Sequence, residues 1–337
     1  TVPIVQGGMG IGVSLSGLAS AVANEGGVGV ISAANVGFNE PDFKTNTVNA
    51  NLRALKSELL KAREKAKTGI IGVNIMSKGH HYEDYARCAA GNGADIIFSG
   101  AGLPADLPAC VEGTDTKIAP IIGSPKAARV ILKLWERHHH RTADMVVIEG
   151  PKAGGHLGFS RKQLEEFTPV TYDQEIRGIL AEVKKYADKY GKEIPVVVAG
   201  GIFTREDMLH AMELGADGVQ MGTRFVTTYE CDASQAYKQT YLRAKKEDIV
   251  IVDSPVGMPG RAIRNRFLEE KESRRESIKK CYQCIATCNP ANTPYCITRA
   301  LVHAAKGETD DALLFCGENA WRCEKMEHVA DIMAEFA

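Results

Sequence analysis

Short apolar runs, repeated eight times before residue 222, constrain the fold of this chain more than any other feature of its sequence. The runs are Pro3–Gln6, Val28–Ser32, Ile70–Ile75, Asp95–Ser99, Lys117–Ile122, Met145–Glu149, Ile194–Ala199 and Gly218–Met221. They alternate with stretches of helical periodicity, which is typical of repeated βα units. The pattern therefore predicts eight parallel strands.

The stretches between these runs predict the helices Ser16–Asn24, Asn51–Lys67, Tyr82–Asn92, Pro125–His139, Asp173–Tyr190 and Arg205–Leu214. The second of them has an apolar stripe at helical spacing, formed by Leu52, Leu55, Leu59 and Ala62. The stretch Leu103–Thr116 contains two prolines and a glycine, so we expect one irregular unit there.

Eight parallel strands can close into a barrel or form an open, doubly wound sheet, and the glycines favour the barrel. A dinucleotide-binding sheet would carry G-x-G-x-x-G after the first strand, and Gly7–Val13 does not fit that motif in any register. The G-x-x-x-x-G-K-[ST] motif of nucleotidases is absent as well. Glycine instead follows nearly every strand, at the ends that form the active face of a (β/α)8 barrel. We therefore predict an α/β fold of the TIM-barrel type.

The last third of the chain departs from the barrel pattern. It contains a predicted helix near Ala233–Lys245, a short strand Ile249–Val252 and the charged stretch Arg261–Lys280. We therefore divide the chain into a barrel over residues 1–226, a small, mainly helical cap over the substrate at 227–310, and a C-terminal part at 311–337. In this last part the amphipathic segment Met326–Phe336 predicts a helix that returns to the barrel.

Charge and composition limit the partners of the chain. Its 41 basic and 42 acidic residues give a net charge of −1, so no global field attracts nucleic acid or an anionic membrane. Apolar runs such as Ile194–Val198 are far too short to span a bilayer. We expect a cytoplasmic protein that acts on a small molecule and is compatible with a homodimer. The chain begins at Thr1 without an initiator methionine, which is compatible with a short leader before it.

The most informative motif, Ile148–Gly158, follows the sixth predicted strand and contains Ala-Gly-Gly-His. Gly154 and Gly155 allow the backbone to approach a planar ligand closely. His156 is then presented in the barrel mouth, where a group that titrates near neutrality can move protons. The alternative interpretation is a glycine-rich turn with an incidental histidine.

Loops after other strands add to this picture. Ala199–Ile202 and Gln220–Phe225 contain small residues whose backbone N–H groups can hold a phosphate, with a hydroxyl from Thr223. Tight turns that seal the barrel are the alternative. Asn74 can hydrogen-bond the edge of a heterocycle, unless it is a capping amide, and Gln6–Gly10 can pack against the flat face of a ring.

Taken together, these motifs resemble those of the FMN-dependent nitronate monooxygenases, formerly called 2-nitropropane dioxygenases. That family is similar in turn to the flavin-type enoyl-acyl-carrier-protein reductases. The resemblance runs in order from residue 2 to about 226, and Pro255–Asn265 resembles the family's cap segment. Its motifs are Gln6–Gly10, Gly72–Ile75, Ser99–Gly102, Glu149–Gly158, Ala199–Ile202 and Gln220–Phe225.

The resemblance implies a role for each matching residue. It implies that the backbone at Gly8 and Met9 and the side chain of Asn74 hold the isoalloxazine of FMN, and that His156 faces the substrate side of the flavin. The phosphate is expected at Gly200, Gly201, Gly222 and Thr223. The remaining expected cofactor contacts are Lys152, Ala153, Gly154, Gly155, Gln220 and Met221. Lys152 stands where many members of the family carry an acidic residue.

The resemblance implies two alternative reactions. In the first, which we favour, an alkyl nitronate gives an electron to FMN and O2 then reacts, while His156 stabilises the anion or removes the α-proton of the neutral nitroalkane. In the second, NAD(P)H reduces FMN and the flavin passes hydride to an enoyl thioester whose carbonyl lies near His156. A flavin-binding barrel without turnover is the third alternative.

Four of the nine cysteines form a dense series in the predicted cap, namely Cys281, Cys284, Cys288 and Cys296. Thiols at such spacings can hold zinc or an iron–sulfur cluster. The spacing matches neither the zinc ribbon nor the bacterial ferredoxin pattern. Buried, reduced thiols in a small helical hairpin are the alternative that we favour.

Overall fold

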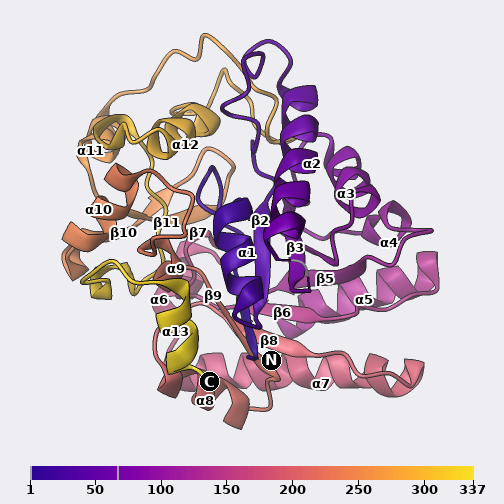
Figure 1. The fold of residues 1–337 in the computed structure, drawn as a ribbon. Coiled ribbons are helices and arrows are strands. Elements are labelled where there is room, and N and C mark those ends of the chain that lie inside the picture. The colour runs from indigo at the N-terminus through magenta and orange to yellow at the C-terminus, as the bar shows by residue number, and fades with distance from the viewer. Residues whose placement is uncertain (1, 67) are drawn as a thin grey trace.

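The computed structural model describes residues 2–66 and 68–337 and contains a closed barrel of eight parallel strands (Figure 1). The strands, in order around the barrel, are β1 (Ile4–Gln6), β2 (Val28–Ser32), β3 (Ile70–Met76), β4 (Ile96–Gly100), β5 (Lys117–Ile122), β6 (Val146–Glu149), β8 (Val196–Ala199) and β9 (Gly218–Met221). β9 closes the barrel against β1, with Val219 opposite Ile4. The predicted TIM barrel is confirmed, and each predicted strand is found to within two residues at either end.

Helices surround the barrel as predicted. They are α1 (Ser16–Asn24), α2 (Thr47–Lys65), α3 (Tyr82–Gly91), α5 (Pro125–His139), α7 (Pro169–Tyr190) and α8 (Arg205–Glu213). α7 begins four residues earlier than expected because Thr168 caps it through the backbone N–H of Thr171. The predicted irregular unit contains only the short helix α4 (Leu107–Cys110), and α6 (Arg161–Glu166) precedes α7. Lys67, the predicted end of α2, lies outside the described residues.

The alternation of side chains along the strands explains the core. Inward-facing residues from neighbouring strands, Val5, Val30, Phe98, Ala119, Val147 and Val197, fill the barrel interior. Their outward-facing neighbours, such as Ile97 and Ile148, pack in the main core together with apolar residues of the helices, for example Trp135 of α5. Because side chains plug the barrel itself, a ligand has room only at the barrel ends.

The segment after β9 contains α9 (Thr223–Val226), α10 (Gln235–Arg243), β10 (Ile249–Asp253), β11 (Pro259–Ile263), α11 (Arg266–Ser273) and α12 (Ile297–Ala305). β10, β11 and β7 (Gly155–His156) form a three-stranded antiparallel sheet. The sequence analysis predicted β10 but not this sheet. Pro259 and Gly260 disfavour a strand locally, and only pairing with distant segments makes one. Helices α10, α11 and α12 still form most of the regular structure of residues 227–310, and the sheet is the part that was not predicted.

The C-terminal segment returns to the barrel as expected. Its helix α13 (Val329–Glu335) packs against α1, and both chain termini lie at the end of the molecule away from α11 and α12 (Figure 1). Short 3-10 turns occur at Lys246–Asp248, Thr309–Asp311 and Ala320–Arg322. The division into three parts at residues 226 and 310 stays a prediction.

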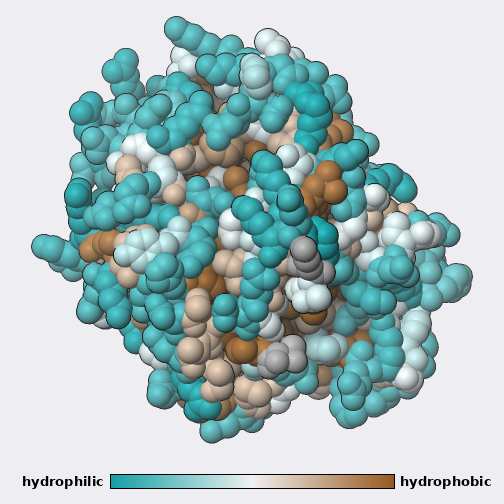
Figure 2. Space-filling view, viewed as in Figure 1, coloured by the Kyte–Doolittle hydropathy of each residue, from teal (hydrophilic) through white to brown (hydrophobic). Residues whose placement is uncertain are grey.

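Among the described residues, no helix has both the length and the apolar composition needed to cross a bilayer. Hydrophilic residues cover most of the face shown in Figure 2, where apolar residues appear only as small, separate patches.

Candidate active site

A cavity of about 490 Å³ opens at the carboxyl ends of the barrel strands. Topology explains its position, because parallel strands present their loops at one face of a barrel. His156 lines this cavity together with every predicted cofactor contact, namely Gly8, Met9, Asn74, Lys152, Ala153, Gly154, Gly155, Gly200, Gly201, Gln220, Met221, Gly222 and Thr223. The structure thus brings all of these residues together, and their roles in binding stay predictions.

Several polar side chains face this cavity without a protein partner. Among the residues that the structure describes, no hydrogen bond is formed by the side chains of Asn74, Glu149, Lys152, Gln220 and Thr223. Polar groups inside proteins are normally hydrogen-bonded. These five groups are therefore free to bind a ligand with several polar atoms.

Glycines shape the cavity wall. A Cβ atom on Gly8 would lie 2.3 Å from the Cβ of Asn74, so only glycine allows that asparagine its position. Gly155, with φ +70°, has open space where a Cβ would point. A planar ligand can therefore approach the backbone at Gly155.

His156 is held by residues that are far away in the sequence. It lies on β7, where it pairs with Gly260 of β11. Its Nε2 atom is 2.8 Å from Oγ of Ser254, and its ring packs edge-on against Phe315 with 4.9 Å between centroids. Neither partner could be predicted, because nothing in the local sequence indicates these long-range contacts.

Burial lowers the pKa of His156 to about 4, and the positive charge of Lys78 contributes to the shift. Burial also raises the pKa of Glu149, at the end of β6, to about 7. Near neutral pH the imidazole is therefore uncharged, while the carboxyl group is close to half-protonated. Two groups whose pKa values move in opposite directions thus line one cavity, which is typical of acid–base sites.

The loop before His156 is fixed by Arg261, whose side chain is buried. Its guanidinium donates hydrogen bonds to the carbonyl oxygens of Pro151, at 2.9 Å, and Ala153. Arg261 also lies 3.8 Å from the carboxylate of Glu318, whose own N–H donates to the carbonyl of Lys152. The cap strand β11 therefore sets the backbone of the Ala-Gly-Gly-His motif.

A second group of residues that the sequence analysis missed forms the cavity rim at 315–319. Asn319 donates a hydrogen bond of 2.8 Å to the carbonyl of Gly201. Tyr237 and Tyr241 of α10 both donate to the carbonyl of Phe315, at 3.2 and 2.6 Å. Within this rim, Gly317 is a residue whose type the site requires, because a Cβ atom there would lie 2.4 Å from Oγ1 of Thr223. A glycine by itself does not indicate this contact in the sequence.

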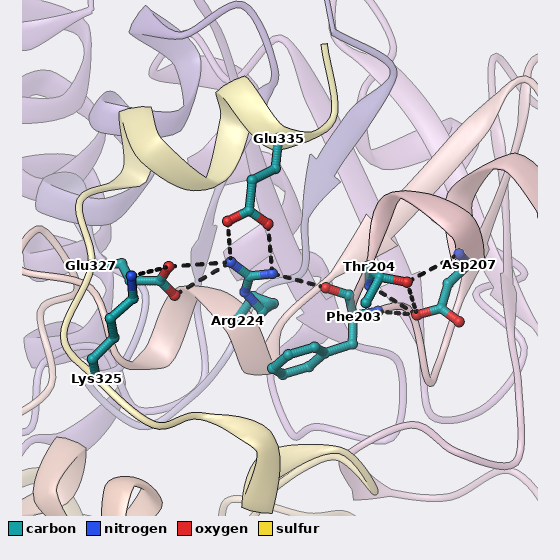
Figure 3. A network of polar contacts seen from close by, with 7 residues as sticks. All are labelled: Phe203, Thr204, Asp207, Arg224, Lys325, Glu327 and Glu335. Carbon is teal, nitrogen blue, oxygen red and sulfur yellow. Dashed lines mark hydrogen bonds and ion pairs between the residues drawn. The ribbon is translucent and has the colours of Figure 1, made fainter.

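Arg224 joins the two predicted phosphate loops to the C-terminal segment (Figure 3). Its guanidinium donates to the carbonyl of Phe203 at 3.0 Å and to both carboxylate oxygens of Glu335 at 3.0 and 3.1 Å. Glu327 accepts a further pair of bonds at 3.3 and 3.4 Å. Arg224 follows Thr223 directly, and Phe203 follows the Gly200 turn, so this network holds both loops in register.

The four clustered cysteines lie in an irregular segment between α11 and α12, not in the helical hairpin that we expected. They are also less buried than expected, because Cys281 is exposed and the other three are only half-buried. Burial raises the pKa of Cys284 to about 11, and Cys296, Cys288 and Cys281 add to the increase. Within residues 2–66 and 68–337, no three His, Cys, Asp or Glu side chains are placed to hold a metal ion. The zinc or iron–sulfur site stays a prediction that this arrangement does not support.

A closed (β/α)8 barrel, with unpartnered polar groups and glycine turns around one mouth, defines a cofactor-binding barrel enzyme. Within that class, the chain belongs to the nitronate monooxygenase family, whose model matches residues 1–337. It is therefore a flavin-dependent oxidoreductase.

Individual relatives carry different names. A probable nitronate monooxygenase of Staphylococcus saprophyticus is 27% identical, over 82% of this chain and 79% of its own. A relative from Mycobacterium tuberculosis, (3aS,4S,5R,7aS)-5-hydroxy-7a-methyl-1-oxo-octahydro-1H-indene-4-carboxyl-CoA dehydrogenase, is 29% identical over 80% of this chain. The match spans 65% of that relative's length.

Solved structures show the same fold over nearly the whole chain. FabK from Thermotoga maritima has a TM-score of 0.75 and 25% identity, covering 99% of this chain and 91% of its own. A nitroalkane oxidase from Streptomyces ansochromogenes has a TM-score of 0.73 and 21% identity, covering 99% of this chain and 95% of its own. The second likeness shows the fold alone.

Proposed function

We propose that the chain binds FMN and oxidises alkyl nitronates with O2. The observation that carries this proposal is the half-buried, uncharged His156 at the wall of the cavity. An imidazole with a pKa of about 4 is a weak base toward the C–H group of a neutral nitroalkane. It can still donate a hydrogen bond to a preformed anion, so the site suits a nitronate better than its parent nitroalkane.

The residues around the cavity fit FMN. Within the part of the chain that the structure describes, the amides of Asn74 and Gln220 have no partner, and they can both donate and accept hydrogen bonds at a heterocycle edge. The open space at Gly155 admits a ring. Lys152 and the hydroxyl of Thr223 offer a cation and a donor for the phosphate.

When bound, FMN supplies the electron-transfer chemistry, and the protein binds and orients the substrate. The hydroxyl of Ser254 fixes Nε2 of His156, so that the imidazole presents one defined face to the cavity. Glu149 can hold or release a proton near neutral pH. Met258 and Leu301, in the proposed cap at residues 227–310, line the cavity with apolar groups that can keep water from the substrate.

Two measurements test the proposal. The purified protein should be yellow, and denaturation should release a flavin that co-elutes with FMN. In anaerobic stopped-flow mixing, propionate 3-nitronate should bleach the flavin rapidly, whereas NADH and NADPH should not. A colourless protein that also fails to bind added FMN would refute the cofactor assignment.

The second candidate is an NAD(P)H-dependent reductase of enoyl thioesters. The structural likeness to FabK supports it, as does the acyl-CoA named for the Mycobacterium tuberculosis relative. Rapid bleaching by a nicotinamide alone, with no response to the nitronate, would favour this reaction. A flavin that responds to neither reagent would indicate a barrel without turnover.

A further inference from the structure

A smaller side pocket of about 90 Å³ adjoins the main cavity. Its wall shares five residues with the main cavity, namely Ala34, Ile75, Met76, His156 and Leu301. The two spaces therefore meet at His156. A molecule whose reacting group lies beside this histidine can extend into the side pocket.

The walls of the side pocket come from both the barrel and the cap. The backbone N–H of Ala286 donates to the carbonyl of Lys78 at 3.0 Å, and the N–H of His80 donates to Cys284 at 3.4 Å. Gly79 and Ile285 form a β-bridge between these segments. The cap loop is thus fastened to the loop after β3, so the pocket has defined walls.

Apolar side chains dominate the pocket near His156, including Met76, Val256 and Leu301. Polar residues also line the wall, among them His80, His81 and Gln283. Four others form a hydrogen-bonded chain. Asn51 donates to Asn35 at 3.4 Å and to Tyr85 at 3.1 Å. Asn35 in turn donates to Thr298 at 3.2 Å. With the amides of Asn35 and Asn51 paired and most of the lining near His156 apolar, the pocket suits an uncharged, apolar group.

We propose that this side pocket binds the aliphatic tail of the substrate, and this inference rests on the proposed nitronate oxidation. Its volume sets the length of that tail. An apolar cavity of about 150 Å³ holds benzene, or roughly 25 Å³ per carbon. A pocket of about 90 Å³ therefore holds roughly four carbons. The substrate class is an unbranched alkyl nitronate with a tail of about that length.

Val48 offers a direct test, because it lies on α2, is half-buried and lines only the side pocket. Val48→Phe adds four carbons and should fill the pocket, whereas Val48→Ala removes two and should lengthen it. Val130→Phe is the matched control, because Val130 is exposed on α5 and lines neither space.

The measurement is isothermal titration of the FMN-loaded protein with unbranched carboxylates of two to ten carbons, whose planar anion resembles a nitronate. In the wild type, each added methylene should lower Kd about fourfold up to about the fourth methylene, and further methylenes should leave Kd unchanged. In Val48→Ala, the affinity should stop rising about two carbons later than in the wild type. In Val48→Phe it should stop rising almost from the shortest chain, and in Val130→Phe it should stop at the wild-type length. If the Val48 variants keep the wild-type plateau, or if chain length has no effect, the proposal is wrong.

Because this assay needs no turnover, its failure can be told apart from failure of the proposed function. A normal chain-length profile in a protein that does not oxidise nitronates would refute the reaction and leave the pocket. Rapid nitronate oxidation with a flat profile would refute the pocket and leave the reaction. Thermal unfolding would show whether Val48→Phe folds. If it does not, the chain-length profiles of the wild type and Val48→Ala still test the proposal.

Discussion

Replacing Arg224 by alanine should destabilise both the fold and the predicted phosphate loops. The side chain of Arg224 is 7% exposed and pairs with Glu327 and Glu335, whose side chains are 16% and 49% exposed. Removing one partner of a buried ion pair costs about 3–5 kcal/mol. Since water screens Glu335, we expect the lower end, about 3 kcal/mol.

This free energy converts into a measurable shift of the melting temperature. Unfolding entropy is about 2.1 cal/mol/K per residue, which gives about 0.7 kcal/mol/K for 337 residues. Arg224→Ala should therefore lower Tm by about 4 °C. If half of the loss is felt at the loops of Phe203 and Thr223, FMN should bind roughly tenfold more weakly, about 1.4 kcal/mol.

Differential scanning calorimetry and fluorescence titration with FMN measure the two effects. Arg161→Ala is the control, because its ion pair with Asp253 joins side chains that are 48% and 83% exposed and should contribute less than about 1 kcal/mol. The reasoning fails if Arg224→Ala melts like the control. An unchanged FMN affinity in a clearly destabilised protein would show that the network holds the C-terminal helix and not the loops.

Three further predictions concern the titrating groups. His156→Asn should keep FMN bound while nitronate oxidation falls by at least about 100-fold, as expected when a hydrogen-bond donor to the reacting anion is lost. Full activity in steady-state assays would make His156 a loop residue only. The folded wild type keeps the Glu149 proton up to about pH 7, whereas a carboxyl of ordinary pKa 4.5 loses it earlier, so stability falls as pH rises through this window. We therefore compare the free energies of unfolding of flavin-free Glu149→Gln and wild type in urea. From pH 4 to pH 8 the difference between them should change by about 3 kcal/mol in favour of the variant. A difference that stays constant with pH would contradict the pKa shift. For His156, whose pKa is lowered from 6.5 to about 4, the unfolded chain gains the proton first as pH falls. As pH falls from 6.5 to 4, the free energy of unfolding of the wild type should therefore decrease. The free energy of unfolding of His156→Asn should decrease by about 3 kcal/mol less over the same range.

The barrel could be predicted from the sequence because its signals are local. Runs such as Val28–Ser32 and Lys117–Ile122 have the composition of buried strands, and the turns between units carry glycine, proline or capping residues. Family resemblance then supplied the loops at the mouth, and all of them line one cavity. What the sequence predicted well is therefore what each βα unit encodes by itself.

The missing parts depend on contacts between distant segments. β7 has two residues and becomes a strand only because Gly260 lies beside it. Ser254 and Phe315 carry no motif that points to His156. The perturbed pKa of Glu149 comes from burial alone, which composition cannot reveal. Pairing and burial of this kind exist only after the chain has folded.

Through these long-range contacts, the C-terminal third of the chain does more than cover the site, because it also fixes the backbone of the site's loops. Arg261 of the cap holds the backbone at Pro151 and Ala153, and Asn319 holds the carbonyl of Gly201. The backbone of His156 itself pairs with the cap strand. A loop with two successive glycines before its histidine has many conformations, and ordering each residue costs about 1–2 kcal/mol. The cap contacts offset that cost before any ligand arrives, so the geometry at His156 depends on cap docking as much as on the barrel.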